Sequence, residues 1–271
     1  MGNTLANSAL TWILGALAVL AYALPVLVRS LADAPARLAL LLAWALHGAT
    51  LWVSLLGLAE GPCFGFGPAV SVMAWLVLTV YALESRLYPQ LHARRALAGL
   101  GAVAVLVGLV FPGSALHAKA SLWLPLHLAL GIASYGLFAA AVVHAWLMTR
   151  TEAQMRQGLA ADTGLPLMTL ERLMFAFVAA GFVLLSATLL AGWFFGEALY
   201  GAGYGSGWKW NHKTIFSVLS WVAFAVLLIG RWRLGWRGKH AVRVLYAGAA
   251  MLLLAYVGSR FVLEVILQRS V

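Results

Sequence analysis

The stretch "LERLMFAFVAAGFVLLSATLLAGWFF" (residues 170–195) decides the fold class of this chain. After Glu171 and Arg172 it carries no charged side chain, and its apolar residues are continuous rather than alternating. About 20 mostly apolar residues suffice for a helix to cross a bilayer, and continuous runs favour helices over the strands of a barrel. We therefore predict that residues 170–195 form a transmembrane helix, long enough to tilt or to project beyond the bilayer.

Comparable apolar runs recur along the whole chain. Of its 271 residues 63% are hydrophobic and 10% are charged, and the mean hydropathy is +0.93. A soluble domain carries about 25% charged residues. We predict an all-α polytopic membrane protein with about eight transmembrane helices, forming one integral membrane domain over residues 1–271. The predicted spans are residues 8–28, 37–57, 68–86, 96–112, 122–149, 170–195, 213–231 and 241–267.

The basic residues indicate the orientation. Thirteen of the 18 Lys and Arg residues lie in or beside the loops after the first, third, fifth and seventh predicted spans. Loops rich in Lys and Arg stay in the cytoplasm, so both termini are predicted to be external. The net charge of +10 reflects these clusters and does not point to nucleic acid. The first basic residue, Arg29, follows the first apolar run, which predicts a retained helix rather than a signal peptide.

Sequence motifs for catalysis are missing from the chain. The single cysteine, Cys63, excludes an internal disulfide and a cysteine-based metal site. The eight Asp and Glu residues form no evident acid–base pair. We therefore assign no catalytic residue. We expect a protein that binds and presents a ligand, and not an enzyme.

A tryptophan-rich segment, "GYGSGWKWNHKTIFSVLSW" (residues 203–221), leads into the predicted span 213–231 on the external side. Indole rings at a membrane surface have two uses. They anchor a protein in the interface, where Trp and Tyr concentrate, or they stack against a flat aromatic ligand. The chain has 12 Trp residues, so anchoring alone explains many of them, and both readings stay open at this point.

This segment resembles the tryptophan-rich loop of the cytochrome c assembly family, whose pattern reads W-G-x-x-W-x-W-D-P-K-E before a helix. Gly205, Trp208, Trp210 and Lys213 match that pattern. The resemblance is strongest over residues 120–271, where "GWRGKHA" (residues 235–241) is similar to the family's basic turn between its last two helices. Four positions depart from the pattern: Tyr204 replaces the first Trp, Asn211 the Asp, His212 the Pro and Thr214 the Glu.

The resemblance implies a haem-binding protein of a bacterial inner (plasma) membrane that passes haem b to apocytochrome c, or works with other cytochrome c biogenesis proteins. It places an external haem-ligating histidine at His127, within "WLPLHLALGIASYGLF" (residues 123–138). Family histidines near the end of the seventh helix and after the last helix are replaced here, by Ile229 and by Leu267 or a neighbour. That loss is more similar to the HemX-like branch, which is associated with tetrapyrrole metabolism.

Two further histidines are candidate ligands of the haem iron, which takes imidazole nitrogen. His47 sits near the middle of the second predicted span, where an ionisable residue is a functional candidate. Tilted helices could bring it level with His127 if the second and fifth spans are neighbours. His212, at the start of the seventh span, could supply the missing ligand. The alternatives are a neutral imidazole bonded to a neighbouring helix for His47 and a polar interface residue for His212.

Other groups would complete such a site. Tyr204, Trp208 and Trp210 would form the aromatic platform, while Lys119, Lys209 and Lys213 are placed to meet the two haem propionates, or only to aid solubility. Elsewhere we predict that Glu171 meets the positive end of a helix dipole, and that Arg260 and Glu264 form an ion pair on one helix face.

Two other functions compete with haem transfer. A regulatory or scaffold membrane protein could keep this fold after losing haem handling, which the missing histidines favour. A solute transporter would require polar residues at the midplane of several helices, and His47 is nearly alone there.

Overall fold

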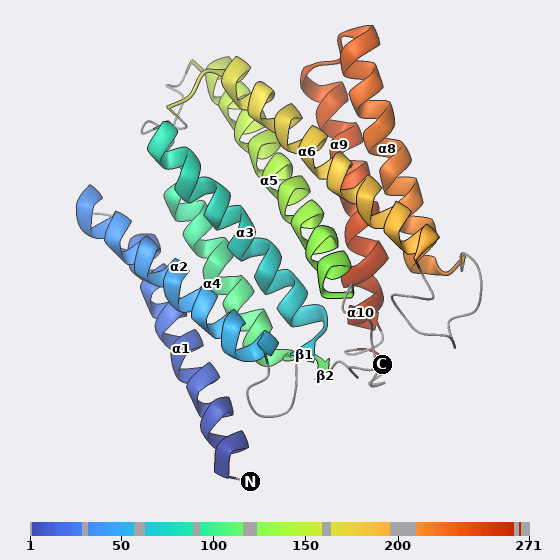
Figure 1. The fold of residues 1–271 in the computed structure, drawn as a ribbon. Helices are drawn as coiled ribbons and strands as arrows, with labels where there is room; N and C mark the ends of the chain where they lie inside the picture. The colour runs from blue at the N-terminus through green and yellow to red at the C-terminus, as the bar shows by residue number, and fades with distance from the viewer. Residues whose placement is uncertain are drawn as a thin grey trace. The chain divides into compact units, whose positions relative to one another are not determined.

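The computed structural model describes most of the chain (Figure 1). The described residues are 2–28, 32–56, 63–88, 93–115, 124–158, 164–195, 210–262 and 266.

A helix lies at each of the eight predicted segments. Seven of the described helices are long and apolar enough to cross a membrane, which confirms a helical polytopic architecture. The eighth, α4, has 17 residues and rises about 26 Å, short of a hydrocarbon core of about 30 Å. The helices are α1 (Gly2–Leu27), α2 (Asp33–Leu56), α3 (Phe66–Leu87), α4 (Arg94–Val110), α5 (Leu124–Arg156), α6 (Leu167–Phe194), α8 (His212–Leu234), α9 (Gly238–Leu253) and α10 (Ser259–Phe261). Strand β1 (Cys63–Phe64) pairs antiparallel with β2 (Ser114–Ala115).

The chain divides into two compact units, which are described separately. Unit 1 comprises Met1–Arg86, Ala93–Leu116 and Arg260–Val271, and unit 2 comprises Leu87–His92 and His117–Ser259.

In unit 1, α1 packs against α2 and α4, while two indoles join α2 to α3. Trp75 Nε1 donates to the Trp44 carbonyl (3.0 Å), Trp44 Nε1 donates to Thr79 Oγ1 (2.8 Å), and the two indoles stack with centroids 5.2 Å apart. Helices α3 and α4 approach closely at Gly67, where an added Cβ would lie 2.1 Å from the Phe111 carbonyl oxygen. The N–H groups of Trp44 and Trp75 thus both donate to acceptors inside unit 1, as burial in an apolar medium requires.

Helices α5 and α6 run antiparallel in unit 2 with a single register along their length. Three contacts at glycines fix it, because the residue numbers of each facing pair add to 319. The pairs are His127 with Gly192, Gly131 with Thr188, and Phe138 with Gly181. Buried residues of α6 recur at alternating intervals of three and four, as in a coiled-coil seam. They include Glu171, Met174, Val178, Gly181 and Leu185.

Helices α8 and α9 complete unit 2. The Ser220 hydroxyl of α8 donates to the Gly248 carbonyl of α9 (2.9 Å), and the Phe224 ring stacks on Phe138 of α5 at 3.7 Å. The last helix continues from α9 through a π-helical segment, η2 (Leu254–Gly258), into α10. Consequently α5 and α8 begin at the end of unit 2 where α6 and η2 finish (Figure 1). We call this end, which carries His127 and Trp210, the indole end.

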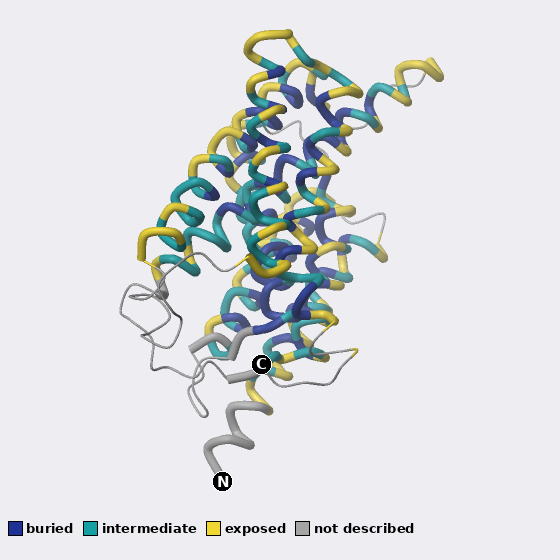
Figure 2. Tube along the Cα trace, turned by 90° about the vertical axis from the view of Figure 1, so that its right-hand side faces the viewer, coloured by how far each residue is buried: buried dark blue, intermediate teal, exposed yellow. Residues whose placement is uncertain are grey.

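Large apolar side chains face outward on both units. Leu20 and Leu38 in unit 1 and Val183 in unit 2 are each more than 60% exposed. Figure 2 shows exposed positions interleaved with buried ones along individual helices. A soluble protein rarely exposes so much contiguous apolar surface, whereas lipid covers it in a membrane.

Candidate functional site

The start of α8 is a capped helix terminus at the indole end. Asn211 is the N-cap, and its Oδ1 accepts from the Thr214 backbone N–H (3.0 Å) and the Thr214 hydroxyl (3.1 Å). Three predicted site residues lie beside this cap. Trp210 precedes the helix with 67% of its surface exposed, His212 is exposed in the first turn, and Lys213 is partly buried.

His127 lies in the first turn of α5, partly buried against α6. Its Cε1 is 3.7 Å from where a Cβ at Gly192 would stand, so the imidazole rests on a helix surface that has no side chain at that point. Trp193, the next residue of α6, is 58% exposed. The α5–α6 register thus brings His127 to the end of the unit where Trp210 and Lys213 lie.

The π-helical segment η2 contributes Tyr256 to the indole end. The Lys213 Nζ lies 5.8 Å from the centroid of the Tyr256 ring, within cation–π distance. π-helical turns inside α-helices are rare and often mark functional sites. Lys213, the predicted propionate-binding cation, thus contacts Tyr256, which was not among the predicted site residues.

Trp221, which closes the tryptophan-rich segment, has a structural role. Its Nε1 donates to the Ser186 hydroxyl of α6 (2.8 Å), and its indole stacks on Phe182 with centroids 5.3 Å apart. This indole fastens α8 to α6 between two and three turns from the indole end. The predicted site residues Tyr204, Trp208 and Lys209, and also Lys119, lie outside the described residues.

His47 in unit 1 has a different environment. It is fully buried, with Nδ1 3.3 Å from the Tyr22 hydroxyl and Nε2 2.8 Å from the Ser71 hydroxyl. The Tyr22 ring meets the imidazole edge-on, with centroids 5.9 Å apart. These are the bonds to neighbouring helices that are expected of a structural histidine, so binding of a metal by His47 would break one of them. His47 belongs to unit 1 and His127, with which it was predicted to share a site, belongs to unit 2.

The other polar predictions have mixed outcomes. The expectation that Glu171 stabilises a helix N-terminus is wrong, because α6 begins at Leu167 and has no acidic residue in its first turn. Glu171 Oε1 instead accepts from Arg231 Nη1 at 2.7 Å. Arg260 is buried, whereas its predicted partner Glu264 lies outside the described residues. No cluster of three His, Cys, Asp or Glu side chains suited to a metal ion occurs among the described residues.

The donor chemistry at the indole end nevertheless fits haem, which needs one or two imidazoles rather than a cluster. The described residues supply an imidazole at His127, a second at His212, an exposed indole at Trp210 and a cation at Lys213. Exposed aromatic residues at the end of α6 enlarge the apolar surface. They are Trp193, Phe194 and Phe195.

Sequence reasoning missed Gly192, Trp193 and Tyr256. The run "AGWFF" (residues 191–195) was available as a signal, because it ends a span with a glycine followed by large rings. Tyr256 had no such signal. The α-helical period gives no warning of a π-helical turn, which changes the residues that share a face.

The fold and these side chains define a class, a polytopic helical membrane protein with an aromatic and histidine-bearing end. The family model described as "Cytochrome C assembly protein" matches residues 36–267. The chain belongs to this family.

Curated relatives agree with that membership. The chain is 31% identical over 206 residues to "Inner membrane protein YpjD" of Escherichia coli K12, covering 74% of each chain. It is 31% identical over 149 residues to an "Uncharacterized 28.8 kDa protein in nifR3-like 5'region" of Azospirillum brasilense, covering 54% of each. A shorter match, 29% over 92 residues, links it to "Cytochrome c biogenesis protein CcsA" of Prochlorococcus marinus, covering 34% of this chain and 28% of that protein. No solved structure matches.

Proposed function

We propose that this protein is a haem-binding member of the cytochrome c assembly family, located in a bacterial inner membrane with both termini external. His127 would ligate the iron of haem b, and His212 is proposed as a second ligand. Family membership and the name of the relative YpjD support this location. The loss of the two family histidines supports placing the chain in the HemX-like branch.

One observation carries the proposal. A partly buried imidazole rests on a glycine surface at the same end of one helical unit as Trp210 and the Lys213–Tyr256 pair. Iron supplies the coordination chemistry when haem is bound, and it takes imidazole nitrogen. His127 would hold the iron, while Lys213 would meet a propionate at the water boundary. Tyr204, Trp208 and Trp210 would cover the macrocycle face, and Lys209 would add a second cation.

The absorption spectrum of protein purified from haem-sufficient cells tests this site. We expect a Soret band in the wild type, its loss in His127→Ala, and a shifted band in His212→Ala. His144→Ala is the matched control. His144 lies in the same helix but about 25 Å further along it, is buried, and has Nδ1 2.8 Å from the Ala140 carbonyl oxygen. An unchanged band in His127→Ala, or equal loss in His144→Ala, would contradict the ligand assignment.

Transfer to apocytochrome c is a separate claim with a separate test. Deleting the gene and staining for c-type cytochromes should show their loss, and plasmid-borne wild type should restore them. Intact cytochromes in the deletion strain would contradict the transfer role, whatever the spectrum shows.

A regulatory or scaffold role without haem transfer is the second candidate. Ile229 occupies the place of a family histidine, and its side chain is 57% exposed. Ile229 lies near the end of α8 opposite the indole end, so the chain lacks a family histidine away from the proposed haem site. A wild-type protein with no Soret band, in a strain whose deletion leaves cytochromes unchanged, would support this role.

A further inference from the structure

The turn between α8 and α9, residues 235–237, is held in one shape by its backbone and by one indole. The N–H groups of Gly235 and Trp236 both donate to the Gly230 carbonyl, and Gly235 has a left-handed φ of 64°. A Cβ at Gly230 would lie 2.5 Å from the Trp236 ring, so only glycine lets the indole seat there. The sequence motif "GWRGKHA" is thus a preformed turn at the end of unit 2 opposite the indole end.

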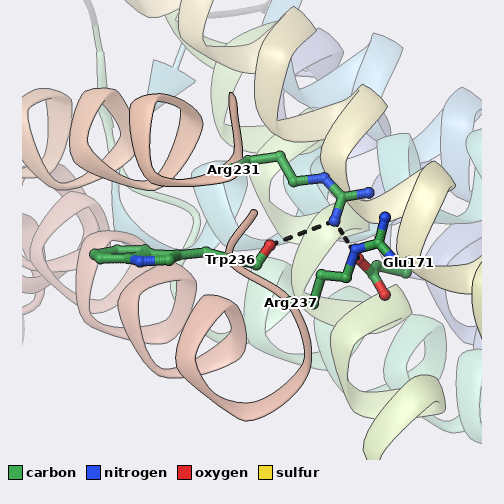
Figure 3. A network of polar contacts seen from close by, with 4 residues as sticks. All are labelled: Glu171, Arg231, Trp236 and Arg237. Atoms are coloured by element: carbon green, nitrogen blue, oxygen red, sulfur yellow. Dashed lines mark hydrogen bonds and ion pairs between the residues drawn. The ribbon is translucent and has the colours of Figure 1, made fainter. Parts of the chain in front are cut away.

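An ion network ties this turn to α6 (Figure 3). Arg231 lies between the Glu171 carboxylate (2.7 Å) and the Trp236 carbonyl oxygen (3.4 Å), and its guanidinium stands 4.7 Å over the Phe175 ring. Arg237 Nε stays 3.8 Å from the same carboxylate oxygen, with 59% of its side chain exposed. Arg231 therefore neutralises the buried acid, and Arg237 directs an additional positive charge toward the solvent.

The surroundings of the turn are strongly basic. Five basic side chains in the turn and on the adjoining helix ends are exposed, whereas Glu171, the acid within the network, is buried and already paired. The five are Arg172, Arg233, Arg237, Lys239 and Arg243. An excess of this kind attracts phosphate groups, for which arginine is especially suited.

A stripe of exposed apolar residues on α8 ends at Arg233, one of these five basic residues. Exposed aliphatic residues recur at intervals of four and three along the helix, and the next position of the series is Arg233. The Arg233 guanidinium stands 4.5 Å over the ring of Trp232, which is 78% exposed. The stripe consists of Ile215, Leu219, Val222, Val226 and Ile229. A free phosphate would use only the charge, whereas a phospholipid would use the charge and the stripe together.

We propose that the α8–α9 turn is a binding site for an anionic phospholipid. Its phosphate would contact Arg233 and Arg237, and an acyl chain would lie along the α8 stripe. The Trp232 indole, at the boundary between the two, suits the interface between headgroups and hydrocarbon. This site stands on residues that the haem proposal does not use.

The test measures which lipids stay bound to the full chain. The protein is reconstituted in nanodiscs of equal parts phosphatidylcholine and phosphatidylglycerol, extracted in mild detergent, and its retained lipids are quantified by mass spectrometry. We expect phosphatidylglycerol to be enriched in the wild type by about fivefold per contacting arginine. The double variant R233Q/R237Q should lose the enrichment, and R233K/R237K should keep most of it.

Arg150→Gln is the matched control, because Arg150, within two turns of the C-terminal end of α5, is also exposed and stands 5.6 Å over an indole, that of Trp146. It should retain the wild-type enrichment. Added inorganic phosphate should not displace the lipid. The proposal is overturned if R233Q/R237Q still enriches phosphatidylglycerol, if Arg150→Gln loses the enrichment equally, or if inorganic phosphate removes it. Melting temperatures of all variants establish that each is folded.

Discussion

His47 and His127 are both histidines within predicted membrane spans, yet the two units give them opposite surroundings. His47 is enclosed in unit 1 with hydroxyl groups at both ring nitrogens, at 3.3 and 2.8 Å. His127 sits in the first turn of α5, partly exposed, against a glycine of α6. Depth in a membrane marks a residue as a functional candidate. The contacts of the ring then decide whether it holds the fold or meets a ligand.

The largest expected effect comes from His47→Ala. The change removes a buried ring and leaves the hydroxyls of Tyr22 and Ser71 without it, which should lower the free energy of unfolding by about 3 kcal/mol. Thermal or denaturant unfolding in detergent measures the loss, with the exposed His240→Ala as a control close to wild type. The Soret absorbance per folded protein should not change. If His47→Ala were as stable as the wild type but bound no haem, His47 would be the haem ligand and its structural role would be contradicted.

The next test acts on the surface beside His127. Gly192→Leu would place a bulky side chain where the imidazole now lies 3.7 Å from a notional Cβ. Displacing the ring should weaken haem binding by about tenfold, or about 1.4 kcal/mol. Gly99→Leu, at a helix position with nothing within 4 Å of its notional Cβ, is the control for adding leucine. Titration of the apoprotein with haem measures both, and equal affinities would contradict the placement of the site.

A smaller effect is expected at the Lys213–Tyr256 contact. Tyr256→Leu removes the ring face below the ammonium group and should weaken haem binding by about 0.5–1 kcal/mol, or two- to fivefold. Tyr256→Phe keeps the ring and should bind haem as the wild type does. The same titration measures this series. A loss in the Phe variant as large as in the Leu variant would point to the hydroxyl group instead of the cation–π contact.

The sequence predicted the helices well because apolar length is a local property. Every predicted span overlaps a described helix, and the shortest, 96–112, corresponds to α4, whose 17 residues fall short of a full crossing. The packing that decides the role of each histidine is not local. The partners of His47 are Tyr22 on α1 and Ser71 on α3, 25 and 24 residues away in the sequence. The sequence around His47 does not indicate which residues these partners are.

Of the residues that lie at the indole end, the sequence selected some as candidates and not others. His127, Trp210 and Lys213 were recognised by their family pattern. Gly192 acquires its meaning only from the α5–α6 register, and Tyr256 only from a π-helical turn that shifts the facing residues. Both depend on helix pairing, which a single sequence does not specify.

The smallest expected effect concerns Asn211, one of the departures from the family pattern. In that pattern the run D-P-K-E reads as a helix start, with Asp as N-cap, Pro in the first position and Glu in the third. Asn211 is the N-cap here, because its Oδ1 accepts from the Thr214 N–H at 3.0 Å.

Asn and Asp cap helices about equally well, so Asn211→Asp should change neither the free energy of unfolding nor that of haem binding by more than about 0.5 kcal/mol. Asn211→Ala removes the acceptor and should destabilise the start of α8 by about 0.5–1 kcal/mol. If Asn211→Asp instead raised haem affinity severalfold, the carboxylate would have a role in the site beyond starting the helix, and the departure would mark a real loss of function.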